Sequence, residues 1–62
     1  MSYSDKIYYA DDLWDSGALV QIVFAIDYPN GLTLDQMLES DRPFLHRAAQ
    51  RIIEREAANG TT

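Results

Sequence analysis

Alternating apolar positions in the first half of the chain predict two β-strands. Residues 6–10 (Lys-Ile-Tyr-Tyr-Ala) are a short strand candidate, because Ile and Tyr suit a half-buried pleated surface. Residues 18–28 are the stronger candidate, and every second side chain there defines a core face: Val20, Ile22, Phe24 and Ile26. The opposite face is only half polar, so we expect another element or another chain to cover part of it.

Two connections flank the stronger strand candidate. Residues 11–17 (Asp-Asp-Leu-Trp-Asp-Ser-Gly) join the two strands, either as a loop or with one helical turn that Asp11 or Asp12 caps. Residues 28–31 (Tyr-Pro-Asn-Gly) predict a turn. Proline pre-sets its own backbone angle, and Asn-Gly accepts the left-handed region that other residues avoid.

A short helix is predicted after this turn, at about residues 34–39. The segment Thr33-Leu34-Asp35-Gln36 has the form of a capping box, in which Thr33 and Gln36 satisfy each other's backbone amides. Leu32 before the cap and Met37 after it have the spacing of a hydrophobic staple.

A longer helix is predicted to follow, with Ser40 or Asp41 as its cap and Pro43 in its first turn, where a missing N–H costs nothing. It should run to about Ala57 or Ala58 and stop at Asn59-Gly60. Six apolar residues recur at helical spacing and predict its buried face: Phe44, Leu45, Ala48, Ala49, Ile52 and Ile53.

These elements predict an α+β fold for one small domain that spans residues 1–62. A two-stranded antiparallel sheet is covered by a short and a long C-terminal helix, and a partner chain could extend the sheet. Residues 1–5 and 57–62 are expected to fray. A chain of 62 residues is marginally stable, and with no cysteine it has no disulfide to help it. Association with a partner or a second copy is therefore the expected source of extra stability.

The charge of the chain is unevenly distributed. Residues 1–41 hold eight acidic side chains and one lysine, which gives −7, whereas residues 42–62 hold four arginines and two glutamates, which gives +2. An acidic N-terminal half repels nucleic acid and attracts basic protein surfaces. We therefore expect no direct binding of nucleic acid.

The segment Asp11-Asp12-Leu13-Trp14-Asp15 fits the Asp-Asp-x-x-Asp pattern that binds magnesium–diphosphate in isoprenoid enzymes. That chemistry needs a deep apolar cavity, which a core of this size does not hold. Helix capping and a solvated acidic turn explain the same residues. We expect no metal site and no cofactor.

Catalytic motifs are not apparent. His46 is the single histidine, and it falls beside Arg42 and Gln50 on what should be a polar helix face, where it lacks the partner and pocket of a general base. None of the serines stands in a nucleophile motif, and the sequence contains no glycine-rich phosphate loop. We expect that the protein is not an enzyme.

Arg47, Arg51 and Arg55 recur every four residues and form a basic stripe beside the apolar face of the long helix. A contact with nucleic acid or phosphate is one interpretation. The favoured alternative is solubility and intramolecular pairing with acidic residues, including the turn at residues 11–15. A third is contact with the acidic half of a second copy.

Aromatic side chains lie among the carboxylates of the acidic half, which is the composition of a protein-binding surface. Trp14 is either a plug in the core or an anchor for a partner. The candidate partner-binding residues are Asp11, Asp12, Trp14, Asp15, Asp27, Tyr28, Asp35 and Glu39.

In length, acidity and the Asp11–Asp15 cluster among aromatics, the chain resembles small phage-encoded inhibitors of the anti-CRISPR type. The resemblance implies an acidic protein-binding module that mimics nucleic acid and occupies the basic surface of a nucleic-acid-handling protein. The alternative is a self-associating structural or regulatory accessory protein, such as a phage accessory or antitoxin-like homodimer, without catalytic activity.

A cytoplasmic location is expected. The longest apolar stretch, residues 18–26, is too short for a transmembrane helix and is interrupted by Gln21. Residues 1–6 contain no basic segment followed by an apolar run, so we expect no secretory signal and no role at a membrane.

Overall fold

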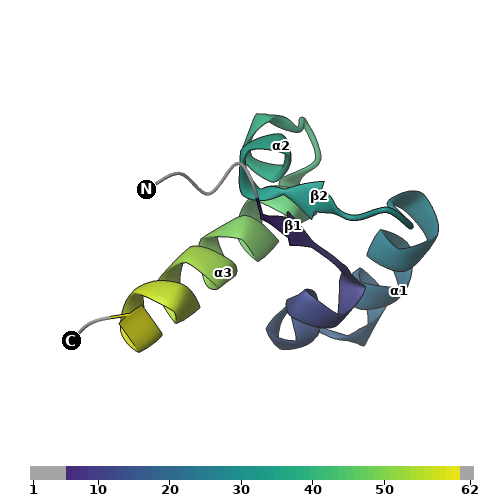
Figure 1. Ribbon diagram of the computed structural model, residues 1–62. Coiled ribbons are helices and arrows are strands. Elements are labelled where there is room, and N and C mark those ends of the chain that lie inside the picture. The colour runs from purple at the N-terminus through teal and green to yellow at the C-terminus, as the bar shows by residue number, and fades with distance from the viewer. Residues whose placement is uncertain (1–5, 61–62) are drawn as a thin grey trace.

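The order of elements combines a small sheet with helices. The computed structural model describes residues 6–60 of the chain. Within these residues, the elements in chain order are strand β1 (Ile7–Tyr8), the 3₁₀ helix η1 (Ala10–Ser16), helix α1 (Ala18–Asp27), strand β2 (Leu32–Thr33), helix α2 (Leu34–Glu39) and helix α3 (Pro43–Gly60), as Figure 1 shows.

The sheet consists of β1 and β2, which run antiparallel with Ile7 opposite Thr33 and Tyr8 opposite Leu32. An α+β fold with a two-stranded antiparallel sheet, a short helix and a long C-terminal helix is therefore confirmed. The predicted strand at residues 18–28 is wrong, because Ala18–Asp27 forms α1. The second strand is instead the short segment just after the turn at Tyr28–Gly31.

The helical conformation of residues 18–27 has a physical reason that the alternating pattern hides. Nearly every residue of this segment is apolar, so it matches the period of a helix as well as that of a strand, and its length is that of a helix. As a helix, it directs Val20 and Phe24, four residues apart, toward the core. Phe24 is fully buried, but Ile22 and Ile26, which the strand model places in the core, are exposed.

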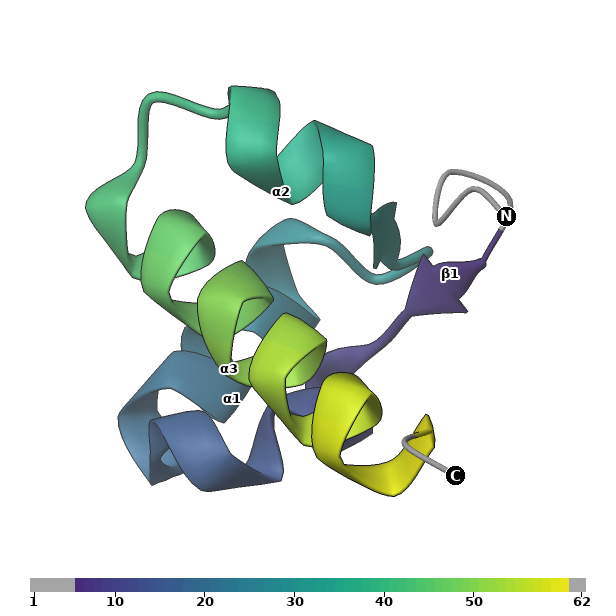
Figure 2. The same cartoon turned by 90° about the vertical axis from the view of Figure 1, so that its left-hand side faces the viewer.

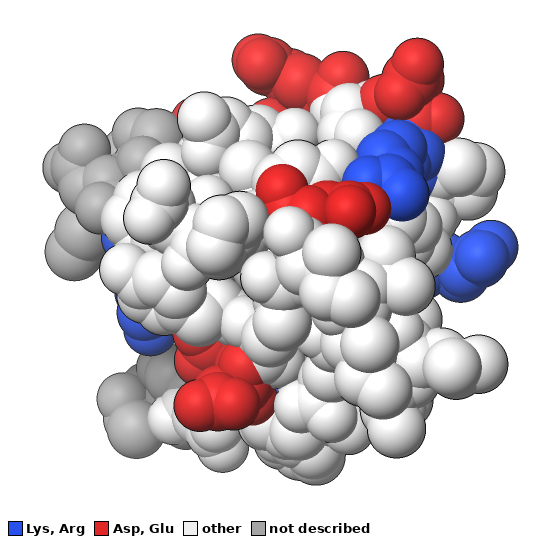
Figure 3. All heavy atoms as spheres, turned by 90° about the vertical axis from the view of Figure 1, so that its right-hand side faces the viewer, with Lys and Arg blue, Asp and Glu red and all other residues white. Residues whose placement is uncertain are grey.

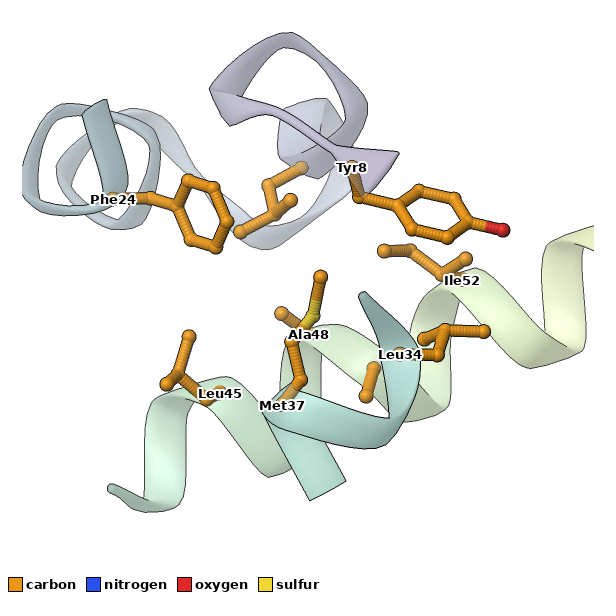
Figure 4. Packing of buried hydrophobic residues seen from close by; sticks show 9 residues of the cluster. Tyr8, Phe24, Leu34, Met37, Leu45, Ala48 and Ile52 are labelled. Carbon is orange, nitrogen blue, oxygen red and sulfur yellow. The ribbon is translucent and has the colours of Figure 1, made fainter. Parts of the chain in front are cut away.

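The core forms along one buried face of α3, which we call the α3 seam. This face consists of Leu45, Ala48, Ala49 and Ile52, which follow the i, i+3, i+4, i+7 spacing of one side of a helix. In Figure 2, α3 crosses in front of the other elements, with α2 above it and α1 and η1 below. Figure 4 shows side chains of the neighbouring elements pointing toward this seam. The buried residues of these elements are Tyr8, Leu13, Phe24, Leu34 and Met37.

The predicted turn and short helix are confirmed. The backbone N–H of Gly31 donates to the carbonyl oxygen of Tyr28 at 2.9 Å. In the capping box, the Gln36 amide N–H donates to Thr33 Oγ1 at 3.1 Å, and the Thr33 N–H donates to Gln36 Oε1 at 2.9 Å. Helix α2 has the predicted bounds, Leu34–Glu39.

The long helix is also confirmed, with Pro43 as its first residue and Gly60 as its last. Ser40 Oγ accepts a hydrogen bond from the Arg42 N–H just before the helix begins. The helix continues through residues 57–60, which the sequence assigns to the frayed end. The other residues predicted to fray, 1–5 and 61–62, lie outside the described residues.

Gly31 should be the less replaceable of the two glycines that have a positive φ. Gly31 (φ +79°) and Gly17 (φ +104°) both adopt backbone conformations that residues with a side chain rarely adopt. A Cβ on Gly31 would lie 2.6 Å from the carbonyl oxygen of Tyr8, whereas a Cβ on Gly17 would meet no atom within 4 Å. We expect Gly31→Ala to lower the melting temperature clearly more than Gly17→Ala. The Gly17→Ala variant carries only the backbone strain of a positive φ, about 1–3 kcal/mol, without a steric clash. Equal losses in thermal melts of the two variants would contradict the close approach of residue 31 to β1.

Candidate protein-binding surfaces

Two of the predicted partner-binding carboxylates are engaged within the fold. Asp12 Oδ2 accepts a hydrogen bond from the backbone N–H of Tyr9 at 2.9 Å and thereby caps η1. Asp15 Oδ1 lies 3.4 Å from Arg55 Nη1, and both of these atoms are buried from solvent. Asp12 and Asp15 therefore stabilise the position of η1 through these contacts.

Trp14 is exposed, with 61% of its surface accessible, so it is not a plug in the core. The Arg55 guanidinium lies 4.9 Å from the centre of its ring. Arg55 Nη2 also donates a hydrogen bond to the carbonyl oxygen of Asp12 at 2.9 Å. Arg55 thus holds η1 against α3 through a backbone oxygen, a carboxylate and an aromatic face.

Asp27 and Tyr28 are joined by Arg42 at the C-terminal end of α1. Arg42 Nη1 donates to Asp27 Oδ2 at 2.8 Å and to the Tyr28 hydroxyl at 3.0 Å. These hydrogen bonds, first to Tyr28 and then to Asp27, raise the pKa of the Arg42 guanidinium. The negative charge of Asp27 is therefore matched by a positive charge on the same surface.

The other predicted carboxylates are exposed, but the structure places them on different elements. Asp35 and Glu39 lie one turn apart on α2, and Asp41 follows them. Asp11 belongs to η1, which lies away from α2 in both Figure 1 and Figure 2. The eight candidate residues therefore do not form one continuous surface.

The basic stripe of α3 is divided. Arg55 is paired as described, which agrees with the favoured interpretation of intramolecular pairing. Arg47 and Arg51 are exposed, and neither forms an ion pair with any residue in the range 6–60. His46 is exposed beside them, and its Nε2 contacts the carbonyl oxygen of Ser40.

Four exposed aliphatic side chains lie on α1, and two of them, Ile22 and Ile26, were predicted to lie in the core. The α1 stripe consists of side chains at positions i, i+3, i+4 and i+7: Leu19 (79% exposed), Ile22 (55%), Val23 (36%) and Ile26 (72%). Figure 3 looks onto this side of the molecule and shows an uncharged expanse over α1, with carboxylates only toward its edges. The helical spacing of the same apolar residues is the signal that could have revealed it.

The exposure of the α1 stripe is energetically significant. Burying a whole Val, Leu or Ile side chain is worth about 1.5–3 kcal/mol. Scaled by the exposed fractions of the four residues, covering the stripe would contribute about 4–7 kcal/mol from this chain alone. A contiguous apolar patch with a polar rim is typical of a protein interaction site.

A hollow adjoins the stripe where α1 meets the start of α3. It has a volume of about 200 Å³ and is lined by Leu19, Val20, Val23 and Phe44, all of which are apolar. The Arg42 guanidinium lies 4.7 Å from the centre of the Phe44 ring, so a positive charge stands beside the hollow. The hollow could receive an apolar side chain from a partner.

Other kinds of site find no support in the part of the chain that is described. Across residues 6–60, no three His, Asp or Glu side chains come together in a way that could hold a metal ion. None of the helices in this range combines the length and apolarity needed to cross a lipid bilayer. Comparison of the chain with protein-family models, with curated proteins and with solved structures finds no match.

Arg55 should contribute measurably to stability, unlike Arg51 four residues earlier. Arg55→Met removes the charged hydrogen bond to Asp12, the pair with Asp15 and the contact with Trp14. We expect a loss of about 1–3 kcal/mol in the free energy of unfolding, as for hydrogen bonds to charged groups. Arg51→Met should change it by less than about 0.5 kcal/mol. Urea unfolding followed by fluorescence of the single tryptophan measures both, and equal effects would contradict the role of Arg55.

Proposed function

We propose that this protein is a non-catalytic protein-binding module that docks through the α1 stripe. The observation that carries the proposal is the exposure of four large aliphatic side chains along one face of a ten-residue helix. The fold already buries Phe24 on the opposite face of α1, so the exposed residues are surplus to the core.

The geometry of the stripe suits one mode of recognition. Anchors at i, i+3, i+4 and i+7 are those that an amphipathic helix presents to a complementary groove or to another helix. The carboxylate of Asp27 and the guanidinium of Arg42 stand at one end of the stripe, where polar groups can set the orientation of a partner.

A second candidate function is supported by the acidic residues of α2 and the following loop. Asp35, Glu39 and Asp41 are exposed, and none forms an ion pair within residues 6–60. They could contact the basic surface of a nucleic-acid-handling protein, as expected for an acidic inhibitor of the anti-CRISPR type. The proposed place of action is the cytoplasm. This surface is separate from the α1 stripe, so one molecule could use both.

Polar substitution of the α1 stripe should remove binding and leave the fold intact. We expect Ile22→Gln/Ile26→Gln to lose the proteins that the wild-type chain retains from a host lysate, because both anchors are exposed in the free chain. The matched control is Leu38→Gln, which changes an exposed apolar residue (41% accessible) on α2. Retention of the same proteins by the double variant, with an unchanged melting temperature, would contradict the proposal.

The acidic surface is tested by charge reversal at residues that do not support the fold. We expect Glu39→Lys/Asp41→Lys to abolish salt-sensitive capture of basic proteins, since placing like charges together in an interface costs several kcal/mol. Asp11→Lys/Glu54→Lys, two exposed changes on η1 and α3, is the control, because it changes the net charge by the same amount. Asp12 and Asp15 are unsuitable probes because they hold η1. Equal capture by the double variant and the control would remove the second candidate function.

A further inference from the structure

We propose that the occupant of the α1 stripe is a second copy of this chain, with the two α1 helices packed antiparallel about a two-fold axis. This inference rests on the proposed function, because it takes the stripe to be a protein-binding surface and names the partner. Three properties of the described residues support it: the symmetry of the stripe, the distribution of charge and the extent of the apolar surface.

The stripe is complementary to itself under a two-fold rotation. A two-fold interface requires that if residue i meets residue j of the second copy, residue j also meets residue i. With the axis between Ile22 and Val23, Ile22 meets Val23 of the second copy, and Leu19 meets Ile26. Each of the four exposed anchors therefore faces an apolar anchor, and none is left opposite a polar residue.

The distribution of charge favours contact between two copies along α1. The chain has a net charge of −5, so two copies repel each other over most of their surfaces. From Ala18 to Ile26, however, α1 carries no charged side chain. Two copies can thus approach closely along α1 without bringing carboxylates together.

The ends of α1 also complement each other in the antiparallel arrangement. Asp27 ends the helix, where its charge opposes the helix dipole. In the proposed dimer it lies beside the first turn of the second copy's α1, which begins at Ala18 and, with Gly17 at the N-cap position, has no side-chain cap. A carboxylate near the free N–H groups of a helix N-terminus is favourable. A parallel arrangement would instead bring the two Asp27 carboxylates together.

The required contact is a modest share of the surface. A biological interface buries at least about 1,000 Å² in total, or roughly 500 Å² from each chain. This is about an eighth of the 4255 Å² that the chain exposes. The α1 stripe, the rim of the hollow at Phe44 and the Asp27–Arg42 pair lie together on this side. Ile26 of the second copy, opposite Leu19, is the side chain placed to enter the hollow.

Sedimentation equilibrium of the full chain over a range of concentrations tests the dimer. We expect the mass to rise from 7.1 kDa toward twice that value as concentration increases. Ile22→Glu places two carboxylates next to the axis and should raise the dissociation constant at least about 100-fold. Leu38→Glu should leave it unchanged. A wild-type mass of 7.1 kDa at every concentration up to about 1 mM would overturn the inference.

Cysteine cross-linking tests the antiparallel geometry, since the chain has no cysteine of its own. A mixture of Leu19→Cys and Ile26→Cys chains should form a disulfide between the two variants under mild oxidation. Leu19→Cys alone should not, because the two copies of residue 19 would be about 10 Å apart along the helix axes, beyond the roughly 7 Å that a disulfide spans. Rapid cross-linking of Leu19→Cys with itself, or equal cross-linking of a Leu38→Cys control, would contradict the arrangement.

Failure of the dimer and failure of the proposed function give different results. A monomeric chain that still loses captured proteins in the Ile22→Gln/Ile26→Gln variant would overturn the second copy as occupant and keep the stripe as a binding surface. A monomeric chain whose captured proteins are unaffected by that variant would overturn both. Circular dichroism of each variant establishes that the helices are retained.

Discussion

The fold is held together by the packing of the other elements on the buried face of α3, the α3 seam. Leu45 and Ile52 supply bulk at its two ends, and Ala48 and Ala49 keep its middle narrow. A narrow middle allows large side chains from other elements, among them Phe24 and Met37, to approach the α3 backbone closely. Helix α2 packs on one side of this seam and η1 on the other, and α1 packs against η1. The two-residue strands connect these layers, and β1 also contributes the buried side chain of Tyr8 to the core.

The same constraint explains why α1 remains exposed on one face. Only one side of each neighbouring helix faces the core. In α1, this side buries Phe24, and Val20 packs against the core as a partly buried residue. Leu19 and Ile26 lie outside this core and are exposed. We propose that this exposed apolar face binds a partner, and its self-complementary spacing is the basis for proposing a second copy as that partner.

Local signals predicted the second half of the chain well and the first half poorly. The Thr33–Gln36 capping box and the apolar period of α3 are short-range patterns, which tertiary contacts reinforce. In residues 18–27, uniform apolarity leaves the period undetermined, and the β-branched residues there favour a strand. As a helix, the segment buries Phe24 in a core built from residues far along the chain, which no local pattern contains. Gly17 before the segment and Pro29 after it were the available boundary signals.

The sequence predicted an acidic, aromatic binding surface. Of its residues, Trp14, Asp11, Asp35 and Glu39 are exposed. Asp15 and Asp27, by contrast, are paired with Arg55 and Arg42. These partners lie 40 and 15 residues away along the chain. The sequence could therefore predict intramolecular ion pairs in general, but not which arginine pairs with which carboxylate. The α1 stripe was missed because a strand at residues 18–28 directs Ile22 and Ile26 inward.

An NMR dilution series of the full chain, with assigned backbone and methyl signals, tests both the helical conformation of α1 and its pairing with a second copy. We expect helical carbon shifts at residues 18–27, together with concentration-dependent shifts concentrated at the methyl groups of Leu19, Ile22, Val23 and Ile26. Extended-strand shifts in this segment would contradict the proposed pairing of α1 helices. So would helical shifts accompanied by methyl signals that do not respond to concentration, or that respond equally at Leu38.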